Sequence, residues 1–153
     1  MRTMLPETDV RTALANIPGK VLLFLDTCHS GKVFGASQNR GFGDIGSFIT
    51  ELSSAENGVI VFAAATGRQA SQEAPEWSNG AFTRAAIEGL QGRADVNHTG
   101  RVTLNMLDLY ISERVKALTG GRQTPTTAKP ATIPDFPIAV IQEIGNEDIE
   151  VAR

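Results

Sequence analysis

The stretch Val21-Leu22-Leu23-Phe24-Leu25-Asp26-Thr27-Cys28-His29-Ser30-Gly31 decides which kind of fold this chain adopts. The unbroken apolar run from 21 to 25 is typical of a strand buried on both faces, as in a parallel sheet covered by helices. Polar residues and Gly31 follow at once, so we expect the strand to end near Asp26. Ligands of open α/β sheets bind at the carboxyl ends of strands. Cys28 therefore stands where chemistry can occur.

Helical and strand patterns alternate along the rest of the chain. The sequence predicts helices over 9–17, 45–54, 81–90 and 103–118, and strands over 21–25, 58–65 and 136–141. The alternation predicts a three-layer α/β domain, a mostly parallel sheet flanked by helices, over residues 1–141. A Pro/Thr-rich connector is predicted over 123–134, and a polar tail over 142–153.

Composition excludes several classes of function. The formal net charge of −3, without a Lys/Arg cluster, argues against a nucleic-acid partner. No apolar run has the length of a signal peptide or of a membrane span. The single cysteine rules out an intrachain disulfide and favours a reducing compartment. We therefore expect a cytoplasmic protein that uses neither a metal nor a cofactor.

The residues by themselves leave the role of Cys28 open. A free cysteine is among the most buried residue types and behaves as a small apolar side chain. The acid, imidazole and hydroxyl groups that flank it favour a nucleophile instead, and some other thiol chemistry is a third reading.

The segment from Leu25 to Gly31 resembles the nucleophile motif of metacaspase-like and bacterial caspase-like peptidases. Phe62 to Glu73 is similar to the next strand and specificity loop of that family, and Asn79 to Leu90 to the helix that follows. Gly121 to Pro125 resembles the segment before the last strand. The resemblance runs in the same order over residues 7–140. It implies the C-terminal part of a caspase-like thiol protease domain.

The family resemblance implies a role for each candidate site residue. Cys28 would be the nucleophile of a cysteine-type endopeptidase, with its backbone N–H as an oxyanion donor. Asp26 would form the floor of a pocket that selects Arg or Lys; its alternative role is to cap the loop. Gln69 and Glu73 would line the substrate cleft. Trp77 would either form the wall of a side-chain subsite or pack against the base of its loop.

The histidine that the resemblance requires is missing before Cys28. In caspases it lies about 50 residues upstream of the cysteine, and none of residues 1–27 is a histidine. His29 adjoins the nucleophile, and neighbouring side chains on an extended chain point in opposite directions. His98 is expected in a turn between helices. We therefore expect the base and the first strands of the sheet to lie upstream of Met1, and the isolated chain to be inactive.

Loss of those strands would leave one edge of the sheet open. We expect the chain to associate with a second copy, or with the absent N-terminal part, through residues 21–25. The alternative function is that of an inactive fragment or pseudoenzyme that acts as an interaction module. The partner of the enzyme itself would be a protein or peptide substrate.

Residues 95–100 carry the first half of a calcium-loop pattern. Oxygen-bearing side chains occupy loop positions 1, 3 and 5, and Gly100 follows at position 6. Position 12 is Met106, where a bidentate glutamate is required. The sequence therefore favours a turn that precedes the helix over a calcium site.

Overall fold

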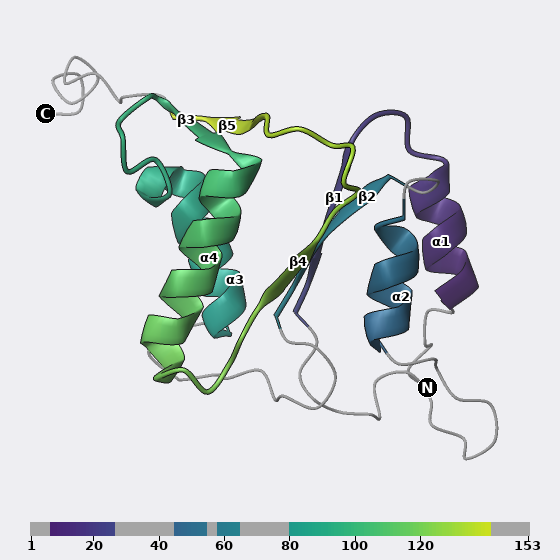
Figure 1. Ribbon diagram of the computed structural model, residues 1–153, viewed down its shortest axis with the longest axis horizontal. Helices are drawn as coiled ribbons and strands as arrows, with labels where there is room; N and C mark the ends of the chain where they lie inside the picture. The colour runs from purple at the N-terminus through teal and green to yellow at the C-terminus, as the bar shows by residue number, and fades with distance from the viewer. Residues whose placement is uncertain (1–6, 27–44, 55–57, 65–79, 142–153) are drawn as a thin grey trace, which may run out of the picture.

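The computed structural model describes residues 7–26, 45–54, 58–64 and 80–141 (Figure 1). In chain order, its elements are α1 (Glu7–Ala15), β1 (Val21–Leu25), α2 (Ile45–Leu52), β2 (Val59–Ala63), α3 (Ala81–Glu88), the π-helical turn η2 (Gly89–Arg93), β3 (Arg101–Thr103), α4 (Leu104–Thr119), β4 (Thr126–Ala128) and β5 (Pro137–Val140). None of the helices in these ranges is both long and apolar enough to cross a membrane.

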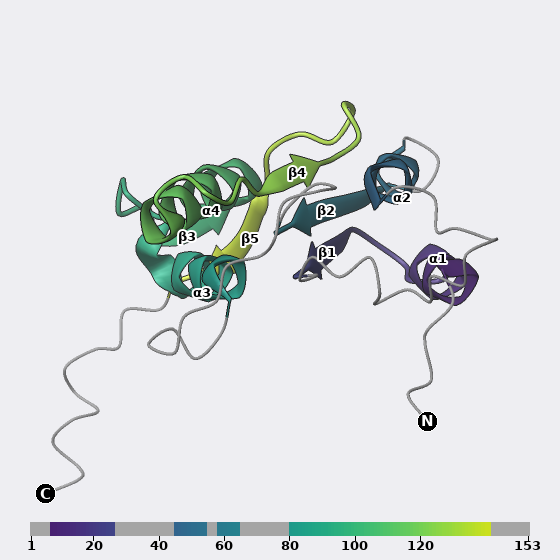
Figure 2. The same cartoon turned by 90° about the horizontal axis from the view of Figure 1, so that it is seen from below.

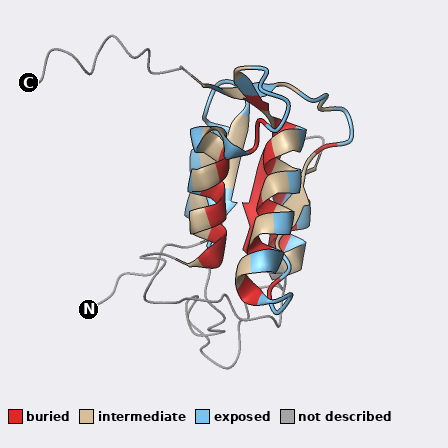
Figure 3. Ribbon diagram, turned by 90° about the vertical axis from the view of Figure 1, so that its left-hand side faces the viewer, coloured by how far each residue is buried: buried red, intermediate tan, exposed pale blue. Residues whose placement is uncertain are grey.

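The fold is a mixed α/β arrangement in three layers. A sheet of strand order β1-β2-β4 lies in the middle. Helices α1 and α2 cover one face, and α3 and α4 cover the other (Figures 1 and 2). Two apolar clusters fill the spaces on the two sides of the sheet. On the α3/α4 side, the two helices turn their buried residues toward each other and toward the sheet (Figure 3).

Strand β2 is the centre of both clusters. All of its residues are buried, because alternate side chains point to opposite faces and both faces are covered. Ile60 and Phe62 pack in the α3/α4 cluster, whereas Val61 and Ala63 pack in the α2 cluster. The strand predicted over 58–65 is therefore confirmed from Val59 to Ala63, and it is buried on both faces.

Strand β1 has the predicted bounds, but the prediction that it is buried on both faces is wrong. Among the described strands it lies at the edge of the sheet, it is half-buried, and Phe24 is 37% exposed. The Phe24 ring stacks on Phe62 with 4.9 Å between ring centroids, so one ring face is covered while the outer edge is open. An apolar run identifies a strand, but it does not say on how many sides neighbours cover it.

The sheet is mixed rather than mostly parallel, which corrects the sequence prediction. Strand β2 pairs with β1 in parallel and with β4 in antiparallel orientation. Strand β4 lies inside the segment predicted as a connector. The predicted last strand, β5, pairs with the unpredicted β3 in a separate antiparallel ladder, away from the main sheet (Figure 1).

Helix α4 begins and ends where the sequence predicts. The Thr103 hydroxyl accepts a hydrogen bond from the Met106 N–H at 3.3 Å, as expected of an N-cap. Gly120 ends the helix in the left-handed region, with φ of 59°. Gly89 lets the end of α3 approach α4 closely, since a Cβ there would lie 2.6 Å from the Leu107 Cδ1 atom.

Glu88 joins α3 to α4 through its carboxylate. One oxygen accepts from the Arg84 Nε at 2.8 Å, and the other accepts from the Arg114 Nε at 2.7 Å. The Tyr110 hydroxyl adds a bond of 3.0 Å. The Arg114 hydrogen bond, helped by those from Arg84 and Tyr110, lowers the pKa of Glu88 to about 2 against the opposing effect of burial. These bonds hold the helix pair together on the side of α3 turned to α4.

We expect Glu88→Gln to reduce the free energy of unfolding at neutral pH. The folded pKa of about 2 lies below the ordinary value of 4.5, so the ionised carboxylate stabilises the fold above about pH 5. This contribution is lost as the pH falls from about 5 toward 2. The shift corresponds to roughly 3 kcal/mol, and solvent screening of the partly exposed arginines reduces our expectation to about 1–2 kcal/mol.

Urea unfolding at pH 7 and pH 3 measures this effect. The wild-type protein should lose more stability between the two pH values than Glu88→Gln does. Glu113→Gln, at an exposed position on α4, is the matched control and should behave as the wild type does. An equal pH dependence in wild type and Glu88→Gln would contradict the assignment.

Candidate functional site

The carboxyl ends of β1 and β2 lie side by side and form the base of the candidate site. Leu25 and Ala63 are the last pair of the ladder, and the Ala64 N–H donates to the Leu25 carbonyl at 2.8 Å. The two segments that carry the remaining predicted site residues begin at this edge. Cys28, Gln69, Glu73 and Trp77 themselves lie outside the described residues.

Asp26 is the predicted site residue that the structure describes. It follows β1 directly, and its side chain is exposed. The Thr83 hydroxyl donates a hydrogen bond of 2.5 Å to the Asp26 Oδ2 atom. Thr83 lies in the first turn of α3, where the partial positive charge of a helix N-terminus favours a carboxylate. The acid is thus held by a neighbouring element and still faces solvent.

Thr83 was not predicted to have a role in the site. It lies within the segment from Asn79 to Leu90 that resembles the family, but its sequence context is that of an ordinary helix. The sequence offers no signal that would pair it with Asp26, 57 positions earlier. The contact exists only because α3 packs against the face of the sheet beside the end of β1.

Gln123 contributes a second polar contact at the same edge. Its side chain is 1% exposed, and its Nε2 atom donates to the Ala64 carbonyl at 2.9 Å. In the sequence, Gln123 begins the predicted connector and lies within the segment Gly121 to Pro125 that resembles the family. Its buried amide therefore adds to the site a group that the pattern did not reveal.

The described histidine is far from this edge. His98 lies in the loop between η2 and β3, which is at the opposite end of the molecule from the carboxyl ends of β1 and β2 (Figure 1). It is exposed and has a φ of 53°, which is typical of a turn residue. His29 lies outside the described residues.

The turn that contains His98 is organised by Asp95, and the prediction of a turn over these residues is confirmed. Asp95 is buried, and one carboxylate oxygen accepts from both the N–H and the hydroxyl of Thr99, each at 2.9 Å. The other oxygen accepts from the Gly100 N–H at 2.7 Å. These bonds, with the Thr99 N–H first, lower the pKa of Asp95. Both oxygens are therefore used by the loop itself.

Across the described ranges, no group of three or more His, Cys, Asp or Glu side chains could hold a metal ion.

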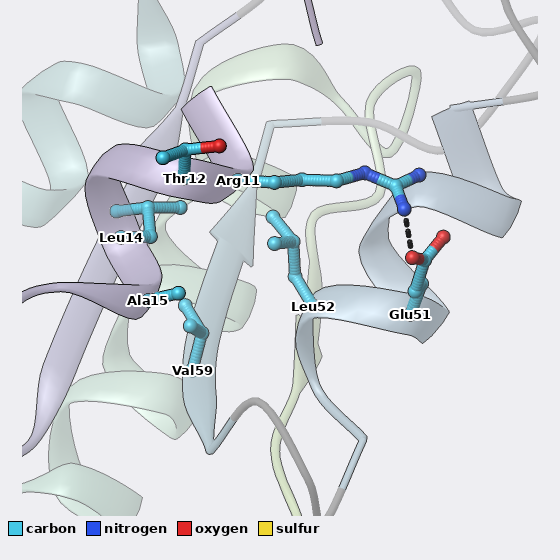
Figure 4. A pocket seen from close by; sticks show the side chains of 7 residues that line it. All are labelled: Arg11, Thr12, Leu14, Ala15, Glu51, Leu52 and Val59. Atoms are coloured by element: carbon cyan, nitrogen blue, oxygen red, sulfur yellow. Dashed lines mark hydrogen bonds and ion pairs between the residues drawn. The ribbon is translucent and has the colours of Figure 1, made fainter. Parts of the chain in front are cut away.

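A small pocket lies between α1 and α2, away from the candidate site (Figure 4). Its volume is about 210 Å³, and Arg11 pairs with Glu51 across its mouth. Val59, the first residue of β2, forms part of its wall, so the pocket is at the amino end of that strand. It has no connection with the edge at Asp26 and gives no reason to assign it a ligand.

No family model, curated protein or solved structure matches the chain. The assignment of a function therefore depends on the sequence motif and on the geometry around Asp26.

Proposed function

We propose that this chain carries the nucleophile of a caspase-like cysteine endopeptidase domain that cleaves peptide bonds after arginine or lysine. The observation that best supports this proposal is the position of the Asp26 carboxylate. It stands at the carboxyl edge of the sheet, exposed to solvent and held by Thr83. Two residues later comes Cys28, the single cysteine of the chain.

Each group has a defined part in the proposed reaction. The Cys28 sulfur attacks the scissile carbonyl carbon, the amine leaves, and water then hydrolyses the thioester. The backbone N–H of Cys28 stabilises the oxyanion. Asp26 binds the guanidinium or ammonium group of the residue before the scissile bond, since a cation that leaves water needs a carboxylate partner. Gln69, Glu73 and Trp77 line the remaining cleft in this proposal.

The base in this proposal is a histidine upstream of the 153 residues, within a longer protein. His98 is at the far end of the fold. His29 adjoins Cys28, and neighbouring side chains on an extended chain point in opposite directions. Without a base, a thiol with a pKa of about 8.5 is only a few per cent thiolate at neutral pH. The isolated chain is therefore expected to be inactive. A reducing, cytoplasmic setting suits a catalytic thiol of this kind.

We expect Asp26→Asn to remove the preference for basic residues. In the longer protein, hydrolysis after arginine and lysine should fall much further than alkylation of Cys28 by the neutral reagent iodoacetamide. In the 153-residue chain, a cationic thiol reagent should alkylate Cys28 faster than a neutral one, and Asp26→Asn should reduce this difference in rate. Two unit charges about 6 Å apart in water attract by about 0.7 kcal/mol, so the rate ratio should fall about threefold or more.

Glu113→Gln is the control for the loss of one negative charge, because that side chain is exposed on α4. It should leave the ratio of reagent rates unchanged. A longer protein that cleaves after aspartate instead would show that Asp26 does not form the pocket. If Asp26→Asn leaves the reagent ratio unchanged, the carboxylate does not act near the thiol.

The alternative function is an inactive interaction module. It is favoured by one observation: within the described residues, β1 pairs with a strand on one side only. A strand edge with unpaired N–H and C=O groups is a template for another chain. This alternative requires the edge, not the thiol, to be the functional feature.

A further inference from the structure

Three arginine side chains surround one carboxylate where α3 and η2 pack against α4. Arg84 on α3, Arg93 at the end of η2 and Arg114 on α4 lie 2.8, 3.8 and 2.7 Å from the nearest oxygen of Glu88. The sequence shows no cluster of basic residues in this region, because β3 and the first half of α4 separate Arg93 from Arg114. The three guanidinium groups meet only because the two helices run side by side (Figure 3).

This arginine cluster carries more positive than negative charge. The Arg114 hydrogen bond, helped by those from Arg84 and Tyr110, holds the pKa of Glu88 at about 2, so the carboxylate is ionised at neutral pH. Burial and the bond to Glu88 raise the pKa of Tyr110, so its hydroxyl stays neutral. Arginine is always protonated in proteins. Three guanidinium groups and one carboxylate therefore leave a net charge of +2, and no second carboxylate among the described residues pairs with these arginines.

Glu88 does not use all the donors of the three guanidinium groups, each of which has five N–H bonds. Arg84 donates to it through Nε, and Arg114 through Nε and Nη2. The Arg93 contact of 3.8 Å is too long for a hydrogen bond. The side chains of Arg84, Arg93 and Arg114 are 33%, 66% and 28% exposed. Each of them therefore keeps N–H groups for a ligand from the solvent.

Two of the three guanidinium groups are held in place before any ligand binds. Glu88 fixes Arg84 and Arg114, and the Tyr110 hydroxyl donates to the same carboxylate at 3.0 Å. Gly89 keeps α3 close to α4 at this level. Ordering a long side chain on binding costs free energy, and here the fold has already ordered two of them.

We propose that Arg84, Arg93 and Arg114 form a binding site for a phosphate group that carries two negative charges. One such group matches the net charge of the cluster, whereas a single carboxylate supplies only one negative charge. Guanidinium groups also match phosphate oxygens with paired N–H bonds. The phosphate binds on the solvent side of the guanidinium groups, and Glu88 holds them from the protein side. The site contains no residue of the proposed peptidase site and does not depend on that function.

A titration of the full 153-residue chain with inorganic phosphate at pH 8, followed by NMR, tests the proposal. Sodium chloride keeps the ionic strength constant, so that general screening is equal in all samples. We expect the Gly89 and Arg93 amide signals to shift along a saturable curve. Acetate, with one charge, should bind at least about fivefold more weakly. A phosphoserine tripeptide distinguishes the two sources of the group: tighter binding than inorganic phosphate indicates a phosphorylated protein, and equal binding indicates a free phosphate.

Arg93→Gln removes one charge from the site and should weaken phosphate binding about fivefold or more. The fold should tolerate this change, because Arg93 is largely exposed and makes only the long contact with Glu88. Lys116→Gln is the matched control: it removes one exposed charge from α4, two positions from Arg114 and therefore from another side of the helix. It should leave phosphate binding unchanged.

Two results would overturn the proposal. Equal shifts with phosphate and with chloride at the same ionic strength would mean that the cluster only joins the two helices. Phosphate binding to Arg93→Gln as tight as to the wild type would place the ligand elsewhere.

Discussion

Replacing Cys28 by alanine should abolish peptide hydrolysis in the longer protein while leaving the fold intact. The proposed reaction forms a thioester on this sulfur, and the chain contains no second thiol that could replace it. The substituted side chain differs by one sulfur atom, so the free energy of unfolding should fall by only about 1 kcal/mol. Turnover of arginyl and lysyl peptides, measured beside urea unfolding, separates the two effects.

Cys28→Ser is the matched variant for the nucleophile. It keeps a hydroxyl of similar size but lacks the acidity of a thiol, so activity should remain a small fraction of that of the wild type. Residual turnover near the wild-type level in Cys28→Ala would remove this residue from the mechanism.

The 153-residue chain should self-associate through β1. We take a second copy as the partner in the isolated chain, because two identical edges can pair antiparallel about a twofold axis. The strand carries no charge and no proline that would block such pairing. Phe24, which stacks on Phe62 on the α3/α4 face of the sheet, is 37% exposed, so apolar surface lies beside this edge. Sedimentation at low micromolar concentration should therefore give a dimer, with slow hydrogen exchange from Val21 to Leu25.

Phe24→Lys places a charge on this edge and should shift the sedimentation to a monomer. Ile87→Lys adds the same charge at an exposed position on α3 and should leave the dimer intact. A wild-type monomer with slowly exchanging β1 amides would contradict the prediction, because the chain would then cover its own edge. A longer protein that is monomeric would show that an upstream segment takes the edge in place of a second copy.

Local sequence patterns predicted the longer elements well. The apolar run at 21–25 coincides with β1, and the helical period over 103–118 matches α4 from Leu104 to Thr119. The helical period of α4 repeats often enough to identify the helix by itself, and the short length of the run at 21–25, between Gly19 and the polar residues after Leu25, identifies the strand. Thr103 and Gly120 mark the two ends of α4 because capping depends on neighbouring residues only.

The short strands were missed for a physical reason. Strands β3 and β4 have three residues each, too few for an alternating pattern to appear. They form because a partner strand offers hydrogen bonds, β5 in one case and β2 in the other. Because β4 pairs antiparallel with β2, the sheet is mixed and not mostly parallel as predicted.

The sequence by itself determined that this is an α/β chain with its single thiol two residues after an acid, at the end of an apolar strand. Cys28, Gln69, Glu73 and Trp77 remain predictions from that motif, because they lie outside the described residues. Only the tertiary structure decided that Thr83 binds Asp26 and that Gln123 binds Ala64, contacts that span 57 and 59 positions of the chain. Such contacts follow from how α3 and the α4–β4 turn pack against the sheet. No local pattern encodes them, since the partners become neighbours only when the apolar faces of those elements are buried together.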